Sequence, residues 1–136
     1  MPWKLTTEFT FDSAHTITGY DGPCGRLHGH TYRVRLELQS DRLRPSAHLK
    51  RAIMVADFRT LKWAKKDVTH GGLDHTFLND HPDLGDDTTA EVIAAYLHRE
   101  TLRRVRTDLP EGDDGSDLRL KVTVWETPDS ACEYWE

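Results

Sequence analysis

Two histidines of this chain are spaced so that their side chains could bind the same metal ion. His28 and His30 are two residues apart, so in an extended backbone both imidazoles point to the same side. The residues that continue this side are apolar: Tyr32, Val34, Leu36 and Leu38. We therefore expect both imidazoles on the core side of a strand, where neutral imidazole is a strong zinc ligand. The alternative is that both histidines merely cap the strand through hydrogen bonds.

A third histidine ends an earlier alternating stretch. Residues 3–15 alternate apolar and polar side chains, and His15 is the last residue on the apolar side. If the two strands pair through the connection at 16–27, the three imidazoles converge at one end of the sheet. Three histidines leave a tetrahedral zinc ion one open position, which is typical of a catalytic site. Cys24, in the connection, could instead be a fourth ligand, and the site would then be structural.

A carboxylate follows the apolar row of the last long strand. The row consists of Leu118, Leu120, Val122 and Val124, and Glu126 is next on the same side. A buried carboxylate is costly unless it is paired or hydrogen-bonded. The protein, solvent at the strand end, or a ligand with two parallel donors could satisfy it. A guanidine-like edge, as on a pterin or guanine, suits a carboxylate especially well.

Asp74 and His75 are adjacent in a segment that has neither helical nor strand periodicity. The segment, residues 73–80, keeps large apolar residues, so it is expected to be an ordered loop, a common place for catalytic groups. The two side chains could serve as a carboxylate and a proton shuttle. Taken alone, the dipeptide favours instead an aspartate that caps backbone amides beside a surface histidine.

The remaining pattern predicts the elements that position these groups. Strands are expected at 3–15, 31–40, 118–126 and 131–135. Asp57 is a suitable N-cap for a helix at about 58–68 that Gly71 and Gly72 end. The expected buried stripe of this helix is Phe58, Leu61, Ala64 and Val68. Residues 41–52 are expected to be a polar turn, and residues 109–117 a flexible loop.

A second helix is expected to begin at the segment Thr88-Thr89-Ala90-Glu91. This segment matches a capping box, in which a threonine and a glutamate three residues later cap each other's backbone amides. The inner side of the helix is expected to carry Val92, Ile93, Tyr96, Leu97 and Leu102.

Composition limits the class of protein. The 136 residues are 37% hydrophobic and 30% charged, as expected of one soluble domain over 1–136. The formal net charge of −5, without a basic block, makes nucleic acid an unexpected partner. No stretch approaches the length of a membrane span, and no apolar run follows the N-terminus as in a signal peptide. Cys24 and Cys132 are therefore expected to be free thiols in the cytoplasm.

Five motifs together resemble the 6-pyruvoyl-tetrahydropterin synthase family. They are Phe-x-x-Ala-His at 11–15, Cys-x-x-x-His-Gly-His at 24–30, Leu-Asp-His at 73–75, Thr-x-Glu at 89–91 and the late Glu126. The three-residue gap between Cys24 and His28 is most similar to the bacterial 6-carboxy-tetrahydropterin synthases of queuosine biosynthesis.

The resemblance implies an α+β tunnelling fold, in which a four-stranded antiparallel sheet has two helices on one face. It implies a homo-oligomeric barrel, a hexamer built as a dimer of trimers, with active sites between subunits. The substrate would be 7,8-dihydroneopterin triphosphate. The product would be 6-carboxy-5,6,7,8-tetrahydropterin, with release of acetaldehyde and triphosphate. The alternatives are elimination to the 6-pyruvoyl compound and, more remotely, a non-catalytic zinc-stabilised interaction domain.

The resemblance also implies roles for individual residues. Zinc would be bound by His15, His28 and His30. Cys24 would be the proton acceptor, and Asp74 and His75 would belong to the proton relay. Glu126, which completes the catalytic set, would anchor the pterin. Thr88 and Thr89 would border the pterin pocket, and Arg26 is a candidate for the triphosphate by its position.

Overall fold

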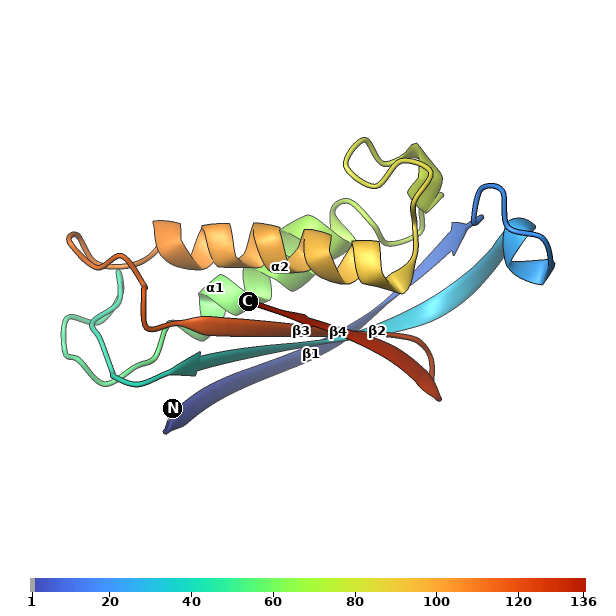
Figure 1. Ribbon diagram of the computed structural model, residues 1–136. Coiled ribbons are helices and arrows are strands. Elements are labelled where there is room, and N and C mark those ends of the chain that lie inside the picture. The colour runs from blue at the N-terminus through green and yellow to red at the C-terminus, as the bar shows by residue number, and fades with distance from the viewer. Residues whose placement is uncertain (1) are drawn as a thin grey trace.

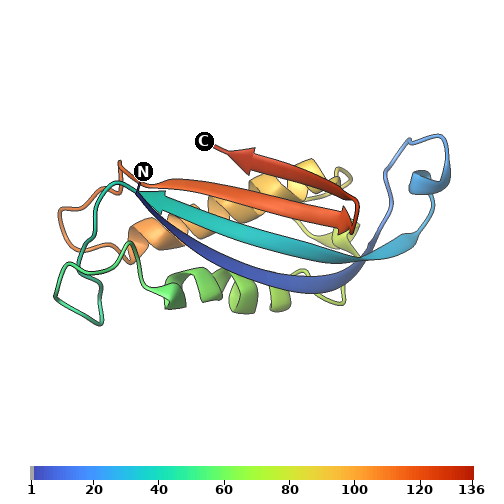
Figure 2. The ribbon, with the colours of Figure 1, turned by 90° about the horizontal axis from the view of Figure 1, so that it is seen from below.

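The computed structural model describes residues 2–136, which form one antiparallel sheet with helices on one face. The strands are β1 (Trp3–His15), β2 (His28–Ser40), β3 (Arg119–Thr127) and β4 (Ser130–Trp135), in the order β1-β2-β3-β4. The longer helices are α1 (Phe58–Trp63) and α2 (Ala90–Thr107). Figure 1 shows both helices on the same side of the sheet, and Figure 2 shows the sheet from its uncovered side. The predicted α+β architecture is confirmed.

β1 and β2 pair over their full length because both alternate apolar and polar side chains. Their register places His15 opposite His28 and Ser13 opposite His30. β2 begins at His28, three residues earlier than the expected start at residue 31, because the ladder with β1 continues into the histidine motif. The face toward the helices is fully buried in the middle of β2, at Tyr32, Val34, Leu36 and Leu38.

The first helix is shorter than expected and continues as a wider turn. Asp57 caps it as predicted, because its side chain accepts a hydrogen bond from the Arg59 amide at 2.9 Å. After Trp63 the chain forms a π-helix over Ala64–His70, in which the Thr69 hydroxyl donates to the Ala64 carbonyl at 2.8 Å. Gly71 follows as the predicted stop, where a side chain would meet the Asp67 carbonyl.

The predicted buried stripe of this helix is wrong at one position. Leu61, Ala64 and Val68 are buried as expected, but Phe58 is 48% exposed. Phe58 is the first residue of α1, and this first turn lies at the margin of the helical layer, where solvent reaches its side chain.

The second helix begins one residue later than the capping-box pattern requires. Thr89 is the N-cap, and its hydroxyl accepts a hydrogen bond from the Val92 amide at 3.3 Å. Thr88 is fully buried, and its hydroxyl donates to the Thr16 carbonyl at 3.1 Å. The predicted capping box is therefore wrong, because tertiary contacts take the side chain of Thr88 away from the helix end.

The polar turn expected at 41–52 contains a buried arginine. Arg44 is 1% exposed, and its guanidinium bonds Asp113 at 2.9 Å and Asp117 at 2.5 Å. It also donates to the Val55 carbonyl at 2.8 Å. The loop expected to be flexible at 109–117 is therefore tied to the end of β2 by ion pairs. These pairs replace the apolar contacts that such a polar segment lacks.

Within residues 2–136, no helix combines the length and the apolar character needed to cross a membrane.

Candidate metal centre and active site

The three predicted ligands lie together where β1 ends and β2 begins. One ring nitrogen from each of His15, His28 and His30 lies within 4.8 Å of the others. The Nε2 atoms of His15 and His28 are 3.0 Å apart. The pairing of the two strands brings the rings together, because His15 and His28 are direct neighbours across the ladder and His30 is the next residue on the same face.

Backbone carbonyls hold two of these rings in one tautomer. His15 Nδ1 lies 2.8 Å from the Thr88 carbonyl oxygen, and His28 Nδ1 lies 2.6 Å from that of Arg26. A carbonyl oxygen only accepts hydrogen bonds, so each Nδ1 carries the proton and donates it. The lone pair of each neutral ring is then on Nε2, the atom that faces the cluster, as in protein metal sites.

The third ring has a buried nitrogen with no hydrogen bond. Among residues 2–136, His30 Nε2 has no hydrogen-bond partner, although it is buried and Glu126 Oε1 approaches it to 3.3 Å. Burial lowers the pKa of both His15 and His30, which favours the neutral form that binds metal. Three imidazoles whose ring nitrogens converge in this way fit a zinc ion, because they supply the nitrogen donors that zinc prefers.

Glu126 lies at the same end of the sheet, as its position in the alternation predicts. Its Oε1 atom is 3.4 Å from His15 Nε2, and its side chain is 33% exposed. The register between β3 and β4 shifts between Trp125 and Thr127, so Glu126 is the extra residue of a bulge. A bulge redirects a side chain locally. The carboxylate is therefore open to solvent on one side and next to the histidines on the other.

Cys24 is exposed in a short 3₁₀ turn over Pro23–Gly25, within the connection between β1 and β2. The turn is fixed by the Cys24 carbonyl, which accepts from the Ile17 amide at 2.9 Å, and by the close approach of Gly25 to Tyr20. A side chain at position 25 would overlap the Tyr20 carbonyl. The thiol does not belong to the group of converging histidine nitrogens among residues 2–136.

Asp74 and His75 form a pair at the outer edge of β1. His75 Nδ1 lies 2.9 Å from Asp74 Oδ2, and Asp74 Oδ1 accepts from the Asp12 amide at 2.8 Å. The hydrogen bond with Asp74 raises the pKa of His75, whose side chain is 77% exposed. The contacts that hold the pair are with Asp12 rather than with the three histidines. The structure therefore presents His75 to solvent, in a group separate from the three histidines.

The two threonines predicted to border the pocket lie just beyond the histidines. Thr88 provides the carbonyl that holds His15, while Thr89 caps α2. Sequence reasoning missed Asn79, whose side chain bonds both backbone groups of Thr16 at 3.0 Å. Asn79 lies in a segment without periodicity, so its only sequence signal is an amide among apolar residues in the 73–80 loop.

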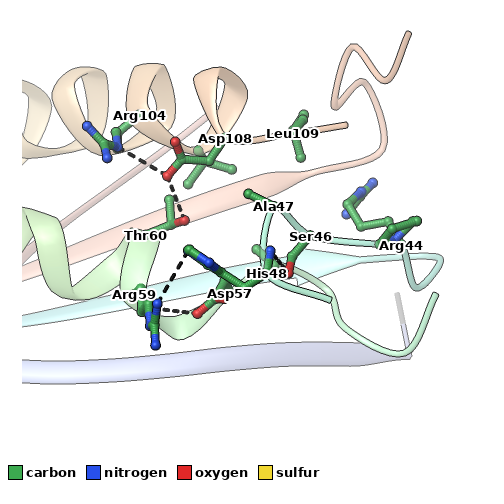
Figure 3. Close-up of a pocket in the computed structure, with 13 residues that line it drawn as sticks. Arg44, Ser46, Ala47, His48, Asp57, Arg59, Thr60, Arg104, Asp108 and Leu109 are labelled. Carbon is green, nitrogen blue, oxygen red and sulfur yellow. Dashed lines mark hydrogen bonds and ion pairs between the residues drawn. The ribbon is translucent and has the colours of Figure 1, made fainter. Parts of the chain in front are cut away.

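A separate hollow lies at the other end of the sheet. It has a volume of about 230 Å³ and is lined by the chain after β2, by α1 and by the end of α2. Figure 3 shows that its polar groups pair with one another: the Thr60 and Arg104 side chains with Asp108, and the Arg59 side chain with His48. The Asp57 carboxylate accepts from the Arg59 backbone amide. This hollow therefore offers few unpaired groups to a ligand, and the histidine end is the stronger candidate site.

Comparison with known proteins agrees with this geometry. The family model described as 6-pyruvoyl tetrahydropterin synthase matches residues 4–136. The 6-carboxy-5,6,7,8-tetrahydropterin synthase of Haemophilus influenzae is 36% identical, over 98% of this chain and 99% of that protein. The protein of the same name from Bacillus subtilis is 32% identical, over 97% of this chain and 84% of that protein.

Solved structures show the same fold. The 6-pyruvoyl tetrahydropterin synthase from Plasmodium vivax superposes with a TM-score of 0.71 at 21% identity, covering 98% of this chain and 97% of that one. The enzyme from Caenorhabditis elegans superposes with a TM-score of 0.66 at 21% identity, covering 98% and 95%. On its fold, its histidine motif and the match over residues 4–136, the chain belongs to the 6-pyruvoyl tetrahydropterin synthase family.

Proposed function

We propose that this chain is a zinc-dependent lyase that converts 7,8-dihydroneopterin triphosphate to 6-carboxy-5,6,7,8-tetrahydropterin, with release of acetaldehyde and triphosphate. The observation that carries the proposal is the convergence of three imidazole nitrogens beside the carboxylate of Glu126. The names of the relatives from Haemophilus influenzae and Bacillus subtilis support this product over the 6-pyruvoyl compound. The product would belong to queuosine biosynthesis.

His15, His28 and His30 would hold the zinc ion through their Nε2 atoms. When bound, zinc supplies a Lewis acid for the hydroxyl groups of the substrate side chain. Glu126 would bind the pterin ring, because the ring offers an N–H and an amino group side by side, which match the two carboxylate oxygens. Thr88 and Thr89, just beyond the histidines, would border the ring.

Cys24 would accept a proton from the substrate side chain. The thiol is exposed on the connection that leads directly into His28, so a substrate at the histidines can reach it. Its position outside the histidine group also disfavours a structural zinc site with Cys24 as fourth ligand. The non-catalytic interaction domain thereby loses its main support.

Asp74 and His75 would deliver the second proton, and they would do so between copies of the chain. The pair is held by Asp12 at the edge of β1, His75 faces solvent, and the group is separate from the three histidines of its own chain. We therefore infer a homo-oligomer in which the Asp74–His75 pair of one copy lies in the active site of a neighbouring copy. A hexamer built as a dimer of trimers is the form we propose.

The chain would work as a single domain over residues 1–136. We also propose that it acts in the cytoplasm, because Cys24 and Cys132 are both free thiols.

The product decides between the two reactions of this family. Zinc-loaded protein is incubated with 7,8-dihydroneopterin triphosphate, and the pterin product is identified by mass. We expect 6-carboxy-5,6,7,8-tetrahydropterin together with acetaldehyde. A 6-pyruvoyl product without acetaldehyde would instead support the alternative reaction. Absence of turnover by protein that carries zinc would contradict both.

A further inference from the structure

His15 is held differently from the other two histidines of the cluster. It is fully buried at the last position of β1, where the strand leaves the sheet. Its Nδ1 atom bonds the Thr88 carbonyl, which comes from the segment before α2. His28, in contrast, is held by a carbonyl two residues away in its own segment. The orientation of His15 therefore depends on a contact between two parts of the chain that are 73 residues apart.

The side chain of Asn79 joins these two parts. Its Oδ1 accepts from the Thr16 amide at 3.0 Å, and its Nδ2 donates to the Thr16 carbonyl at 3.0 Å. The amide thus pairs both backbone groups of Thr16, the residue directly after the end of β1. Both bonds require the oxygen and nitrogen in this orientation, because the Thr16 amide only donates and its carbonyl only accepts.

The Thr88 side chain lies within hydrogen-bond distance of both Thr16 and Asn79. Its hydroxyl lies 3.1 Å from the Thr16 carbonyl and 3.3 Å from Asn79 Oδ1. The same hydroxyl oxygen is 3.2 Å from His15 Nδ1. Asn79, Thr16 and Thr88 therefore form one hydrogen-bonded group around the proton-bearing nitrogen of His15. The turn that carries Asn79, Leu78–Asp80, is anchored by the fully buried Leu78.

We propose that Asn79 is a positioning residue for the metal ligand His15. Asn79 holds the end of β1 against the segment before α2, so that the Thr88 carbonyl keeps the His15 proton on Nδ1 and the lone pair on Nε2. This inference rests on the proposed metal site. Mutation of the group that bonds a ligating histidine typically lowers metal affinity by about 10- to 100-fold, and Asn79 supports that group, Thr88, through Thr16 and the Thr88 hydroxyl.

The test uses Asn79→Ala in the full chain and two measurements. Zinc affinity is measured by competition with a chromophoric chelator, and cobalt absorption spectra report the geometry of the ligands. We expect the variant to bind zinc about 10- to 100-fold more weakly and to change the cobalt spectrum. In the metal-free protein, nitrogen chemical shifts of His15 report its tautomer. They should show the Nδ1-protonated form in the parent and a mixture in the variant.

Ser40→Ala is the matched control at the opposite end of the sheet. Ser40 is fully buried and its hydroxyl bonds Asp117 at 2.7 Å, so its loss also removes a tertiary hydrogen bond. We expect this variant to lose stability without a change in zinc affinity. An equal loss of affinity in both variants would show that Asn79 acts only through global stability, and would overturn the proposal.

Zinc affinity within threefold of the parent, with an unchanged cobalt spectrum, would also overturn it. If Asn79→Ala does not fold, Asn79→Asp decides the question. The aspartate keeps the bond from the Thr16 amide and loses the donor to the Thr16 carbonyl, so weaker zinc binding would support the role of Asn79 and parental binding would overturn it. The parent protein separates this result from the proposed function. A parent that binds no zinc overturns both proposals, whereas one that binds zinc without turnover contradicts only the reaction.

Discussion

The ring nitrogens of His15, His28 and His30 have different hydrogen-bond partners. Carbonyl oxygens fix the Nδ1 protons of His15 and His28, whereas the buried Nε2 of His30 makes no hydrogen bond within the described part of the chain. An unpaired buried nitrogen costs free energy unless a ligand satisfies it. At the residue scale, this donor set is therefore better suited to a bound ion than to a hydrogen-bonded cluster.

Cys24→Ala should separate the roles of ligand and base. The thiol lies outside the group of converging nitrogens, so we expect the variant to keep one equivalent of zinc. Turnover should fall by at least about 100-fold, the usual contribution of a general base. Metal analysis and product formation are measured on the same sample. Loss of zinc together with activity would identify Cys24 as a fourth ligand.

Glu126→Gln should weaken pterin binding while zinc remains bound. The glutamine keeps the shape of the side chain but places an NH₂ group where the pterin also donates. We expect a loss of about 1.5–3 kcal/mol, or roughly 10- to 150-fold in Kd for a pterin. Titration calorimetry with a pterin measures this loss. Binding within threefold of the parent would mean that other groups hold the ring.

The His75–Asp74 pair should be visible in a pH titration. Because the hydrogen bond with Asp74 raises the pKa of His75, its imidazole should stay protonated to a higher pH than an ordinary histidine. Asp74→Asn should return the pKa of His75 toward its usual value near 6.5. Nuclear magnetic resonance titration of the ring protons checks this. An identical pKa in both proteins would contradict the pairing.

The pKa shifts of His75 and Asp74 also make the stability of the fold depend on pH. The raised pKa of His75 stabilises the fold below the ordinary histidine pKa, and this contribution is lost as pH rises through the pKa of His75 in the folded protein. The pKa of Asp74 is lowered, first by the Asp12 amide and then by His75, so its contribution is lost as pH falls through that lowered pKa. The pair is therefore fully formed between these two limits.

At the scale of elements, the end of β2 is held by the ion pairs of Arg44. Arg44→Met leaves Asp113 and Asp117 without their buried partner, so we expect the free energy of unfolding to fall by about 3 kcal/mol. Urea unfolding measures the change. Arg42 bonds the same two aspartates, but its side chain is 52% exposed. Arg42→Met should therefore cost less than about 1 kcal/mol, and an equal loss in both variants would contradict this explanation.

Within residues 2–136, hydrogen bonds from other segments cover about half of the outer edge of β1. Backbone or side-chain groups of His70, His75 and Thr76 bond the outward-facing groups of Thr10, Asp12 and Ala14. Even-numbered residues of β1 therefore turn their backbone groups away from β2. From Trp3 to Phe9, the same alternation leaves Lys4, Thr6 and Glu8 with outward-facing backbone groups. This half of β1 is the part that another strand could join.

At the scale of the whole molecule, we expect the open half of β1 to pair with β4 of a second copy. Both are edge strands of the sheet, and β4 has six residues, Ser130–Trp135. Thr6→Pro removes an outward-facing N–H without removing a bond to β2, so the chain should fold but lose its oligomeric state. Sedimentation measures the mass. Thr6→Val keeps the N–H and should keep the parental mass.

A Thr6→Pro variant with the parental mass would place the interface elsewhere. Because the Asp74–His75 pair lies on the same edge of β1, loss of the oligomer should also abolish turnover while zinc remains bound. Retained turnover by a monomer would contradict the shared site.

The sequence by itself determined which side chains share a face. His15, His28, His30 and Glu126 could be assigned to the core side because strand alternation is a local property with a period of two residues. The cap at Asp57, the stop at Gly71 and the four strands follow from equally local preferences. The family motifs, which are also short and local, carried the resemblance over the same residues.

The tertiary structure alone decided the contacts between distant segments. The hydrogen bonds of Asn79 and Thr88, the burial of Arg44 and the exposure of Phe58 all depend on where segments far apart in the chain meet. Thr88 shows the reason most clearly, because its sequence pattern favours a helix cap, while contacts with Thr16 and His15 determine its actual role. A local sequence pattern cannot predict such contacts, because they contribute to stability only once the distant segments have come together in the folded chain.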